Sequence, residues 1–191
     1  TEYMKKIIIT FVALIIGLIC RAQTIDEHYY FKSLSSQNGL SQNTVSAILQ
    51  DSKGFMWFGT KDGLNQYDGL VFRTFQKENS SLGNNFITAL HEDAEGNIWV
   101  GTDTGVYIYN PRLEKFTPFD IPIEGTGETI SRTITWIDSD PQKDVWISSD
   151  SQGLFHYDIK KNSLKEYSAK IGKGALNITR FWFGDNELWV N

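Results

Sequence analysis

The sequence predicts an all-β fold, a β-propeller of about three and a half four-stranded blades from a larger ring that we expect to have seven. Three observations support this prediction. A tryptophan motif recurs at Trp57, Trp99, Trp146 and Trp189, with spacings of 42, 47 and 43 residues. Short apolar–polar alternations rich in β-branched and aromatic residues surround each tryptophan. No helical periodicity occurs beyond the first twenty residues. A fixed period near 42 residues is typical of a propeller blade.

The positions that recur in phase around each tryptophan are glycine or aromatic. They are Trp57, Gly59, Gly63 and Tyr67 in the first copy, Trp99, Gly101, Gly105 and Tyr109 in the second, Trp146, Gly153 and Tyr157 in the third, and Trp189 in the fourth. Repeat positions that are apolar or glycine in every copy are typical of a structural scaffold. We therefore expect these residues to form the blade cores, and no catalytic residue among them.

Each repeat predicts four short strands bounded by glycine, aspartate and asparagine. In the first copy the strands span about 45–50, 55–60, 64–68 and 71–76. Three blades are expected at about 45–76, 86–119 and 133–167, with a partial blade at 178–191.

An aspartate lies six residues before each of the first three tryptophans, at Asp51, Asp93 and Asp140. The segments 51–54 and 93–96 suit tight turns, because aspartate can bond its own backbone and glycine adopts positive φ without a Cβ clash. They resemble the start of a calcium loop but lack its further carboxylates and terminal glutamate. The pattern therefore indicates turns.

The tryptophans of the repeat lie in the middle of apolar strands. We expect Trp57, Trp99, Trp146 and Trp189 to pack between neighbouring blades, in preference to forming stacking platforms for sugar rings. Trp136 and Trp182 break the repeat pattern and fall on predicted innermost strands. They are the better candidates for exposure at the central channel.

Residues 1–22 are predicted to be a signal peptide. Two lysines precede a 14-residue apolar stretch, Ile7–Cys20, which is short for a membrane span. Small flanking residues favour cleavage after Ala22. A lipoprotein would need Cys20 as its first mature residue, but bulky Ile19 stands where a small residue is expected. We therefore expect an exported protein whose only cysteine leaves with the signal, so that no disulfide forms.

The charge balance is acidic. The full chain has 18 basic and 23 acidic residues, a formal net charge of −5. Removing residues 1–22 leaves 15 basic and 22 acidic residues, a net charge of −7. Nucleic acids and anionic membranes bind basic patches, so the composition argues against both as partners of this segment.

Both ends of the repeat array are incomplete in the sequence. Tyr29–Leu34 matches the outer strand 72–75 and precedes any tryptophan motif, so we expect an outer strand at 29–34 that completes the last blade of a ring. At the other end, Asn191 follows directly after the tryptophan strand of the fourth copy. Residues 23–191 are therefore predicted to be an incomplete propeller whose remaining blades lie beyond Asn191, since an open arc would expose sheet edges.

Residues that could carry chemistry are sparse. His28, His91 and His156 fall at three different repeat positions, and without a cysteine this scatter argues against a metal site or cofactor. Gly125–Gly127 is glycine-rich, but no helix is predicted after it, so a phosphate cradle is not expected. Asp62, Asp103 and Asp150 follow the tryptophan strands and are expected to be solvated turn residues at one rim.

The recurring pattern Asp-x-x-Gly-x-x-Trp-x-Gly-Thr-x-x-Gly-Leu/Val-x-x-Tyr-Asp/Asn resembles the two-component regulator propeller repeat. The match is nearly complete at 51–68 and 93–110 and covers only the front half at 178–191. It is degraded at 140–158, where Lys143 replaces the first glycine and Ser148-Ser149 replace Gly-Thr. The opening segment from Phe31 to Val45 resembles the mature N-terminus of hybrid two-component sensors of polysaccharide-degrading bacteria.

This resemblance implies a periplasmic sensor. Members of that family carry two periplasmic propellers, a small β-sandwich, a membrane helix, a histidine kinase, a receiver and a DNA-binding domain. Their ectodomain binds oligosaccharides and switches on glycan-utilisation genes. The resemblance therefore implies an oligosaccharide ligand in the complete ectodomain, a homodimer in the full-length protein, a location at the periplasmic face of the inner membrane, and kinase activity outside these residues. It ties no ligand contact to the repeat motif.

Two alternatives remain open. A propeller enzyme of the lyase or quinoprotein type would need convergent His, Arg or carboxylate groups at the channel, and only Arg132 and Arg180 occupy equivalent positions before inner strands. A non-catalytic interaction scaffold would need no such group. We expect this segment itself to have no enzymatic activity.

Overall fold

The computed structural model describes residues 2–19, 30–168, 177–184 and 187–191. The chain divides into two units, residues 1–33 and 34–191. The first contains the helix α1 (Glu2–Ile19), which covers most of the predicted signal peptide. Among the described residues, no helix has the length and hydropathy that crossing a membrane requires. The predicted cleavage site after Ala22 lies outside the described residues.

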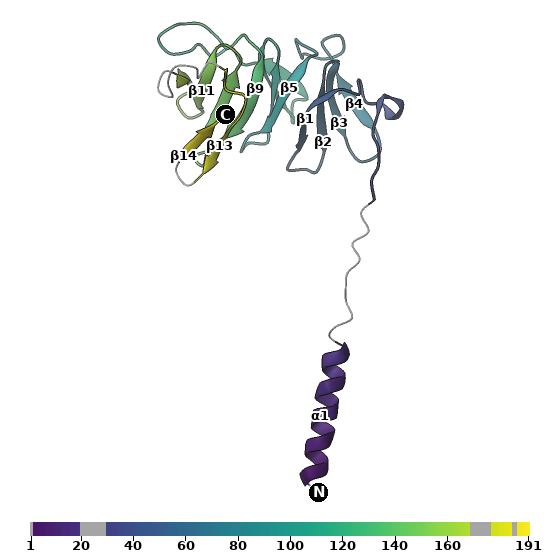
Figure 1. Cartoon of the computed structure of the whole chain (residues 1–191). Coiled ribbons are helices and arrows are strands. Elements are labelled where there is room, and N and C mark those ends of the chain that lie inside the picture. The colour runs from purple at the N-terminus through teal and green to yellow at the C-terminus, as the bar shows by residue number, and fades with distance from the viewer. Residues whose placement is uncertain (1, 20–29, 169–176, 185–186) are drawn as a thin grey trace. The chain divides into compact units, whose positions relative to one another are not determined.

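The second unit consists of antiparallel sheets that follow one another along the chain (Figure 1). Blade one contains β1 (Val45–Gln50), β2 (Met56–Thr60), β3 (Gly63–Tyr67) and β4 (Phe72–Phe75). Blade two contains β5 (Ile87–Glu92), β6 (Ile98–Thr102), β7 (Gly105–Asn110) and β8 (Lys115–Pro118). Blade three contains β9 (Ile134–Ser139), β10 (Val145–Ser149), β11 (Gly153–Asp158) and β12 (Ser163–Glu166). Blade four contains β13 (Phe181–Gly184) and β14 (Glu187–Val190).

Within each blade the strands pair in sequence order, so every blade is a simple meander. The predicted all-β propeller fold is confirmed, and residues 45–167 contain no helix. Because successive strands run in opposite directions, the β2–β3 type turns and the connectors between blades lie at one face of the array, which we call the connector face. The β1–β2 type turns, which carry the repeat aspartates, lie at the opposite face, which we call the aspartate face.

The predicted outer strand at 29–34 is not formed within the described residues, and its pairing with a blade beyond Asn191 stays a prediction. Residues 30–35 have no regular secondary structure, and they lead into the 3-10 helix η1 (Ser36–Asn38). A strand exists only through a hydrogen-bonded neighbour, and no described strand pairs with this segment. Tyr30 and Phe31 are accordingly 92% and 97% exposed.

The repeat tryptophans pack each blade against the next. Trp57, Trp99 and Trp146 are 0%, 2% and 9% exposed, which confirms their prediction as core residues. Trp57 shares a core cluster with residues of blade two, Trp99 with residues of blade three, and Trp146 with Ile178 and Phe181 of blade four. Each indole therefore belongs to the interface with the following blade.

The repeat tyrosines complete the same interfaces from the other side. The ring of Tyr109 lies edge-on to Trp57 at 5.4 Å between centroids, and that of Tyr157 lies 5.8 Å from Trp99. Aromatic pairs at such distances add about 0.5–1.5 kcal/mol beyond the area they bury. Tryptophan and tyrosine of one repeat therefore contact different blades, so the repeat pattern encodes contacts between blades as well as within them.

Trp189 departs from this arrangement. It is 51% exposed and stacks on Trp182, itself 48% exposed, with ring centroids 6.3 Å apart and nearly parallel planes. Within the described residues no further sheet covers blade four, so the indole lacks the inner strands that bury its three counterparts. The expectation that Trp189 packs between blades is therefore wrong for these residues.

Glycine after the tryptophan allows adjacent blades to approach closely. A Cβ on Gly59 would lie 2.6 Å from Cγ2 of Ile87, and one on Gly101 would lie 2.7 Å from Cγ2 of Ile134. Blade three has Ser148 at this position, and its hydroxyl lies 2.8 Å from Oγ1 of Thr135. The interface between blades three and four therefore accommodates a side chain that the other two interfaces exclude.

Replacing Gly101 with alanine is expected to destabilise the protein by about 1–3 kcal/mol, because the new methyl group overpacks the interface against Ile134. Ser148→Ala is the matched control, since it keeps the Cβ and removes only a hydroxyl contact, at about 1 kcal/mol. Urea unfolding monitored by tryptophan fluorescence measures both. A Gly101→Ala variant as stable as the parent would contradict the close-approach argument.

Replacing Trp99 with alanine is expected to cost about 3–5 kcal/mol, because it leaves a large cavity between blades two and three. The matched variant Trp189→Ala removes an indole that is half exposed, so its cost should be far smaller. Equal losses in thermal and urea unfolding would show that the burial of Trp99 is not what stabilises the fold.

Candidate functional site

The aspartate of each repeat fixes both a turn and the buried indole. In blade two, Oδ1 of Asp93 accepts hydrogen bonds from the backbone N–H groups of Glu95 and Asn97, both at 2.9 Å. Its Oδ2 accepts from Nε1 of Trp99 at 2.8 Å. Asp93 is 9% exposed, so the carboxylate is satisfied almost entirely by the protein. One side chain thus closes the hairpin and supplies the acceptor that a buried indole needs.

The same unit recurs in the neighbouring blades. Oδ2 of Asp51 accepts from Nε1 of Trp57 at 2.8 Å, and Oδ2 of Asp140 accepts from Nε1 of Trp146 at 3.0 Å. The sequence predicted the turns at these aspartates but not their bonds to the tryptophans. The constant six-residue spacing between the two residues was the signal that could have revealed them.

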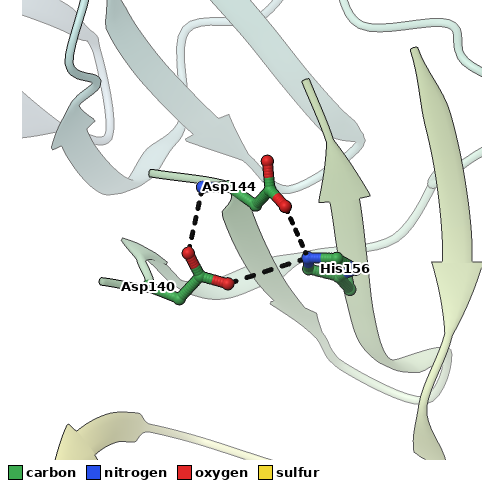
Figure 2. Close-up of side chains that lie close together, drawn as sticks. All are labelled: Asp140, Asp144 and His156. Atoms are coloured by element: carbon green, nitrogen blue, oxygen red, sulfur yellow. Dashed lines mark hydrogen bonds and ion pairs between the residues drawn. The ribbon is translucent and has the colours of Figure 1, made fainter. Parts of the chain in front are cut away.

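Blade three adds two side chains to this unit. Asp144 lies directly before β10 and His156 lies on β11, where it pairs in register with Trp146. Figure 2 shows the His156 ring nitrogen facing carboxylate oxygens of both Asp140 and Asp144, while the backbone nitrogen of Asp144 faces Asp140. Nε2 of His156 lies 3.3 Å from Oδ2 of Asp144 and 3.7 Å from Oδ2 of Asp140. The three residues, which we call the blade-three triad, come from the β9–β10 turn at the aspartate face and from strand β11.

The triad is partly buried and held in place. The side chains of Asp140, Asp144 and His156 are 10%, 18% and 16% exposed. Oδ1 of Asp140 accepts from the N–H of Asp144 at 3.0 Å, and Oδ1 of Asp144 accepts from the N–H of Ile159 at 3.2 Å. The imidazole of His156 lies 4.7 Å from the Trp146 ring. All three groups are therefore positioned by backbone and aromatic contacts.

The other two blades lack this cluster. In blade two the position of Asp144 is taken by Asn97, whose Nδ2 donates to Oδ2 of Asp93 at 3.1 Å, and the position of His156 is taken by Ile108. In blade one these positions hold Phe55 and Gln66. The turn and the indole bond are complete there, so Asp144 and His156 are additions to the repeat.

Sequence reasoning missed this cluster because it treated His156 as isolated. The histidine is twelve residues from Asp144 in the chain, and only the hairpin register of β10 and β11 brings them together. Pairing the predicted strands of the third repeat would have put His156 opposite Trp146. It would then have been clear that His156 lies near the two aspartates of the preceding turn.

The other candidate histidines are placed differently. His91 lies on the inner strand β5, with Nε2 2.7 Å from Oγ of Ser139 and Nδ1 3.7 Å from Oδ1 of Asp138, so it links blades two and three. Burial lowers the pKa of His91, and the nearby carboxylates of Asp138, Asp93 and Glu92 offset that only in part. His28 lies outside the described residues.

The candidate channel residues also differ from expectation. The Trp136 ring is half-buried beneath the Arg180 guanidinium, whose Cζ lies 4.2 Å from the ring centroid. Nε1 of Trp136 is buried and has no hydrogen-bond partner within the described part of the chain. Trp182 is exposed as expected. Arg132 is exposed at the connector face, where its backbone N–H donates to Oε1 of Gln152.

The rim aspartates lie in the turns of the connector face. The N–H of Asp103 donates to the carbonyl of Phe86, and that of Asp150 donates to the carbonyl of Thr133. Asp62 donates its N–H to Oγ1 of Thr60, whose hydroxyl in turn donates to the carbonyl of Gly63 at 2.9 Å. The backbone bonds of Asp103 and Asp150 attach these turns to the preceding connectors. The threonine hydroxyl holds the turn closed, which explains why Gly-Thr-x-x-Gly recurs.

The family model for the two-component regulator propeller matches residues 39–62 and 81–104. These two segments, which include β1–β2 and β5–β6, are similar to the two-component regulator propeller repeat. The chain is also 37% identical over 73 residues to Histidine kinase P4 of Formosa agariphila, a match that covers 38% of this chain and 5% of that protein.

Solved structures agree with this assignment. The extracellular domain of a B. thetaiotaomicron protein assigned as a hybrid two-component system superposes with a TM-score of 0.74 and 27% identity, covering 85% of this chain and 24% of that one. A second extracellular domain from that organism, at 23% identity and a TM-score of 0.70 over the same shares, has the same fold. The repeats of this chain therefore form propeller blades similar to those in the extracellular domain of a hybrid two-component system. The chain spans 5% of the curated relative's length.

Acidification is expected to weaken the contact between blades two and three through His91. Its pKa in the folded protein is lowered by burial, so the unfolded state binds the proton more readily. Stability should therefore fall as the pH drops below the unfolded pKa of about 6.5. His91→Gln should lose less stability than the parent between about pH 7.5 and pH 5.5. Urea unfolding at both pH values measures this loss. An equal loss of unfolding free energy in the parent and in His91→Gln would contradict the role of His91.

Proposed function

We propose that this chain is part of the exported, periplasmic sensor region of a hybrid two-component system, and that the complete region binds an oligosaccharide and controls glycan-utilisation genes. The observation that carries the proposal is the likeness to an extracellular domain of such a system, at 27% identity over 85% of this chain. The match to a histidine kinase places similar repeats in a signalling protein.

The structure supports a sensor because the repeat residues have structural roles, which leaves the loops free to bind a ligand. The tryptophan, tyrosine and glycine positions are buried within and between blades, and the aspartates bond the indoles. What differs between repeats is the connector face, where the connectors 76–86 and 119–133 differ in length and sequence. Variable loops on a fixed scaffold allow ligand specificity to change without refolding the core.

Export and polarity fit the same proposal. A basic segment followed by an apolar helix and small residues is a pattern typical of secretion. The acidic charge of the chain disfavours nucleic acid as a ligand. An uncharged, hydroxyl-rich oligosaccharide needs instead a concave polar rim, which a closed ring of blades provides.

The test is calorimetric titration of the complete extracellular region, expressed from the whole gene, with a panel of oligosaccharides of defined linkage. We expect one class of glycan to bind, and the same class to induce a reporter placed behind the glycan-utilisation genes in the native host. Absence of any binding or induction across the panel would contradict the proposal. A catalytic turnover of the bound glycan would favour the enzyme alternative.

Residues 23–191 alone are expected to bind no oligosaccharide tightly, because an open rim buries too little of a polar ligand to offset the entropy of fixing it. Exposed Ile48, Trp182 and Trp189 should also promote self-association. Light scattering and the same glycan panel measure both properties. A well-behaved monomer with micromolar affinity would show that these blades are a functional unit by themselves.

A further inference from the structure

We propose that the blade-three triad, Asp140, Asp144 and His156, binds a divalent transition-metal ion, with zinc as the ion that fits best. This inference is independent of the ligand that the sensor recognises. It concerns the aspartate face, where the sequence had predicted no metal site because the histidines are scattered among the repeats.

The distances between the triad atoms suit a shared ion. Nε2 of His156 lies 3.3 Å from Oδ2 of Asp144 and 3.7 Å from Oδ2 of Asp140, and all three ligand atoms lie within 4.8 Å of one another. Ligands that are each about 2.0–2.1 Å from a tetrahedral zinc ion lie roughly 3.3 Å apart. The two distances to His156 are therefore close to those that a shared ion requires.

The ligand types select the class of metal. One imidazole nitrogen and two carboxylate oxygens form a mixed N/O set that suits zinc and neighbouring transition metals. Calcium and magnesium prefer sites made entirely of oxygen. A hollow of 260 Å³ is lined by Asp140, Trp146 and residues of blade four, so Asp140 can be reached from solvent on that side.

The residues behind the ligands hold them in position. Asp140 is fixed by N–H donors from Gln142 and Asp144 and by Nε1 of Trp146. Asp144 accepts the N–H of Ile159, and the His156 ring contacts the rings of both Trp146 and Tyr167. Such outer contacts orient metal ligands in known sites and strengthen binding.

The comparison with blade two supports an ion as well. In blade three two carboxylates and one imidazole share a partly buried space. Blade two shows that the hairpin does not require this arrangement, because Asn97 replaces the second carboxylate there and bonds Asp93 directly. Asp144 and His156 are therefore not required by the turn or by the indole bond, and their ligand atoms converge where a cation can be shared.

A bound ion would connect the β9–β10 turn to β11. It would restrain the end of blade three, where Lys143 takes the place of glycine at a φ of 74°. We expect the metal to stabilise the folded state by linkage, since unfolding separates the three ligands.

The test is isothermal titration of the untagged 191-residue chain with zinc after treatment with a chelator, in a mild detergent that keeps the apolar helix in solution. We expect one zinc ion to bind per chain and to raise the melting temperature. Cobalt should bind in its place with the visible absorption of a tetrahedral N/O site. His156→Gln should weaken zinc binding by roughly tenfold or more.

Two further variants make the outcome decisive. Asp144→Asn reproduces the residue of blade two, so it should fold normally and still lose the zinc affinity and the thermal shift. His91→Gln is the matched control, because it removes a histidine near Asp138 outside the triad and should bind zinc as the parent does. No zinc binding by the parent, or binding that His156→Gln and Asp144→Asn leave unchanged, would overturn the proposal.

Discussion

The hydrogen bond from a buried indole to the aspartate six residues before it is the interaction on which the propeller depends. It spans 2.8 Å in blades one and two and 3.0 Å in blade three. An indole between blades contributes a large apolar area, but its N–H must find an acceptor away from water. The turn aspartate supplies that acceptor and at the same time closes the hairpin through its second oxygen. Loss of this residue would therefore weaken both the hairpin and the interface.

Much of the fold follows from the sequence because its signals are local and repeated. The tryptophan period predicts the blades, and alternation predicts strands that the structure places within about one residue, as at 45–50 for β1. The failures concern partners that are not local. The segment 30–35 lacks a neighbouring strand, and Trp189 lacks a following blade within the described residues. The triad required the register between β10 and β11, which places His156 opposite Trp146 although the turn before Gly153 is one residue longer than in the other repeats.

Blade three shows how a degraded repeat can gain chemistry. Lys143 and Ser148 replace glycines that the other blades use for a left-handed turn and for close blade approach. The indole bond nevertheless persists at Asp140. Because this bond keeps the hairpin in place, neighbouring positions can change without loss of the fold. In blade three two of these positions hold Asp144 and His156. Function in a repeat protein is therefore better sought where a repeat deviates than where it matches.

A double-mutant cycle on Asp93 and Trp99 tests the role of the indole bond most directly. Asp93→Asn can keep the turn acceptor but turns an amide toward the indole N–H, so it should cost about 1–3 kcal/mol in urea unfolding. In the Trp99→Phe background no indole N–H is present, and the same change should cost less, giving a coupling free energy of about 1 kcal/mol or more. If Asp93→Asn costs the same in both backgrounds, the aspartate acts on the turn alone and the indole bond does not stabilise the blade.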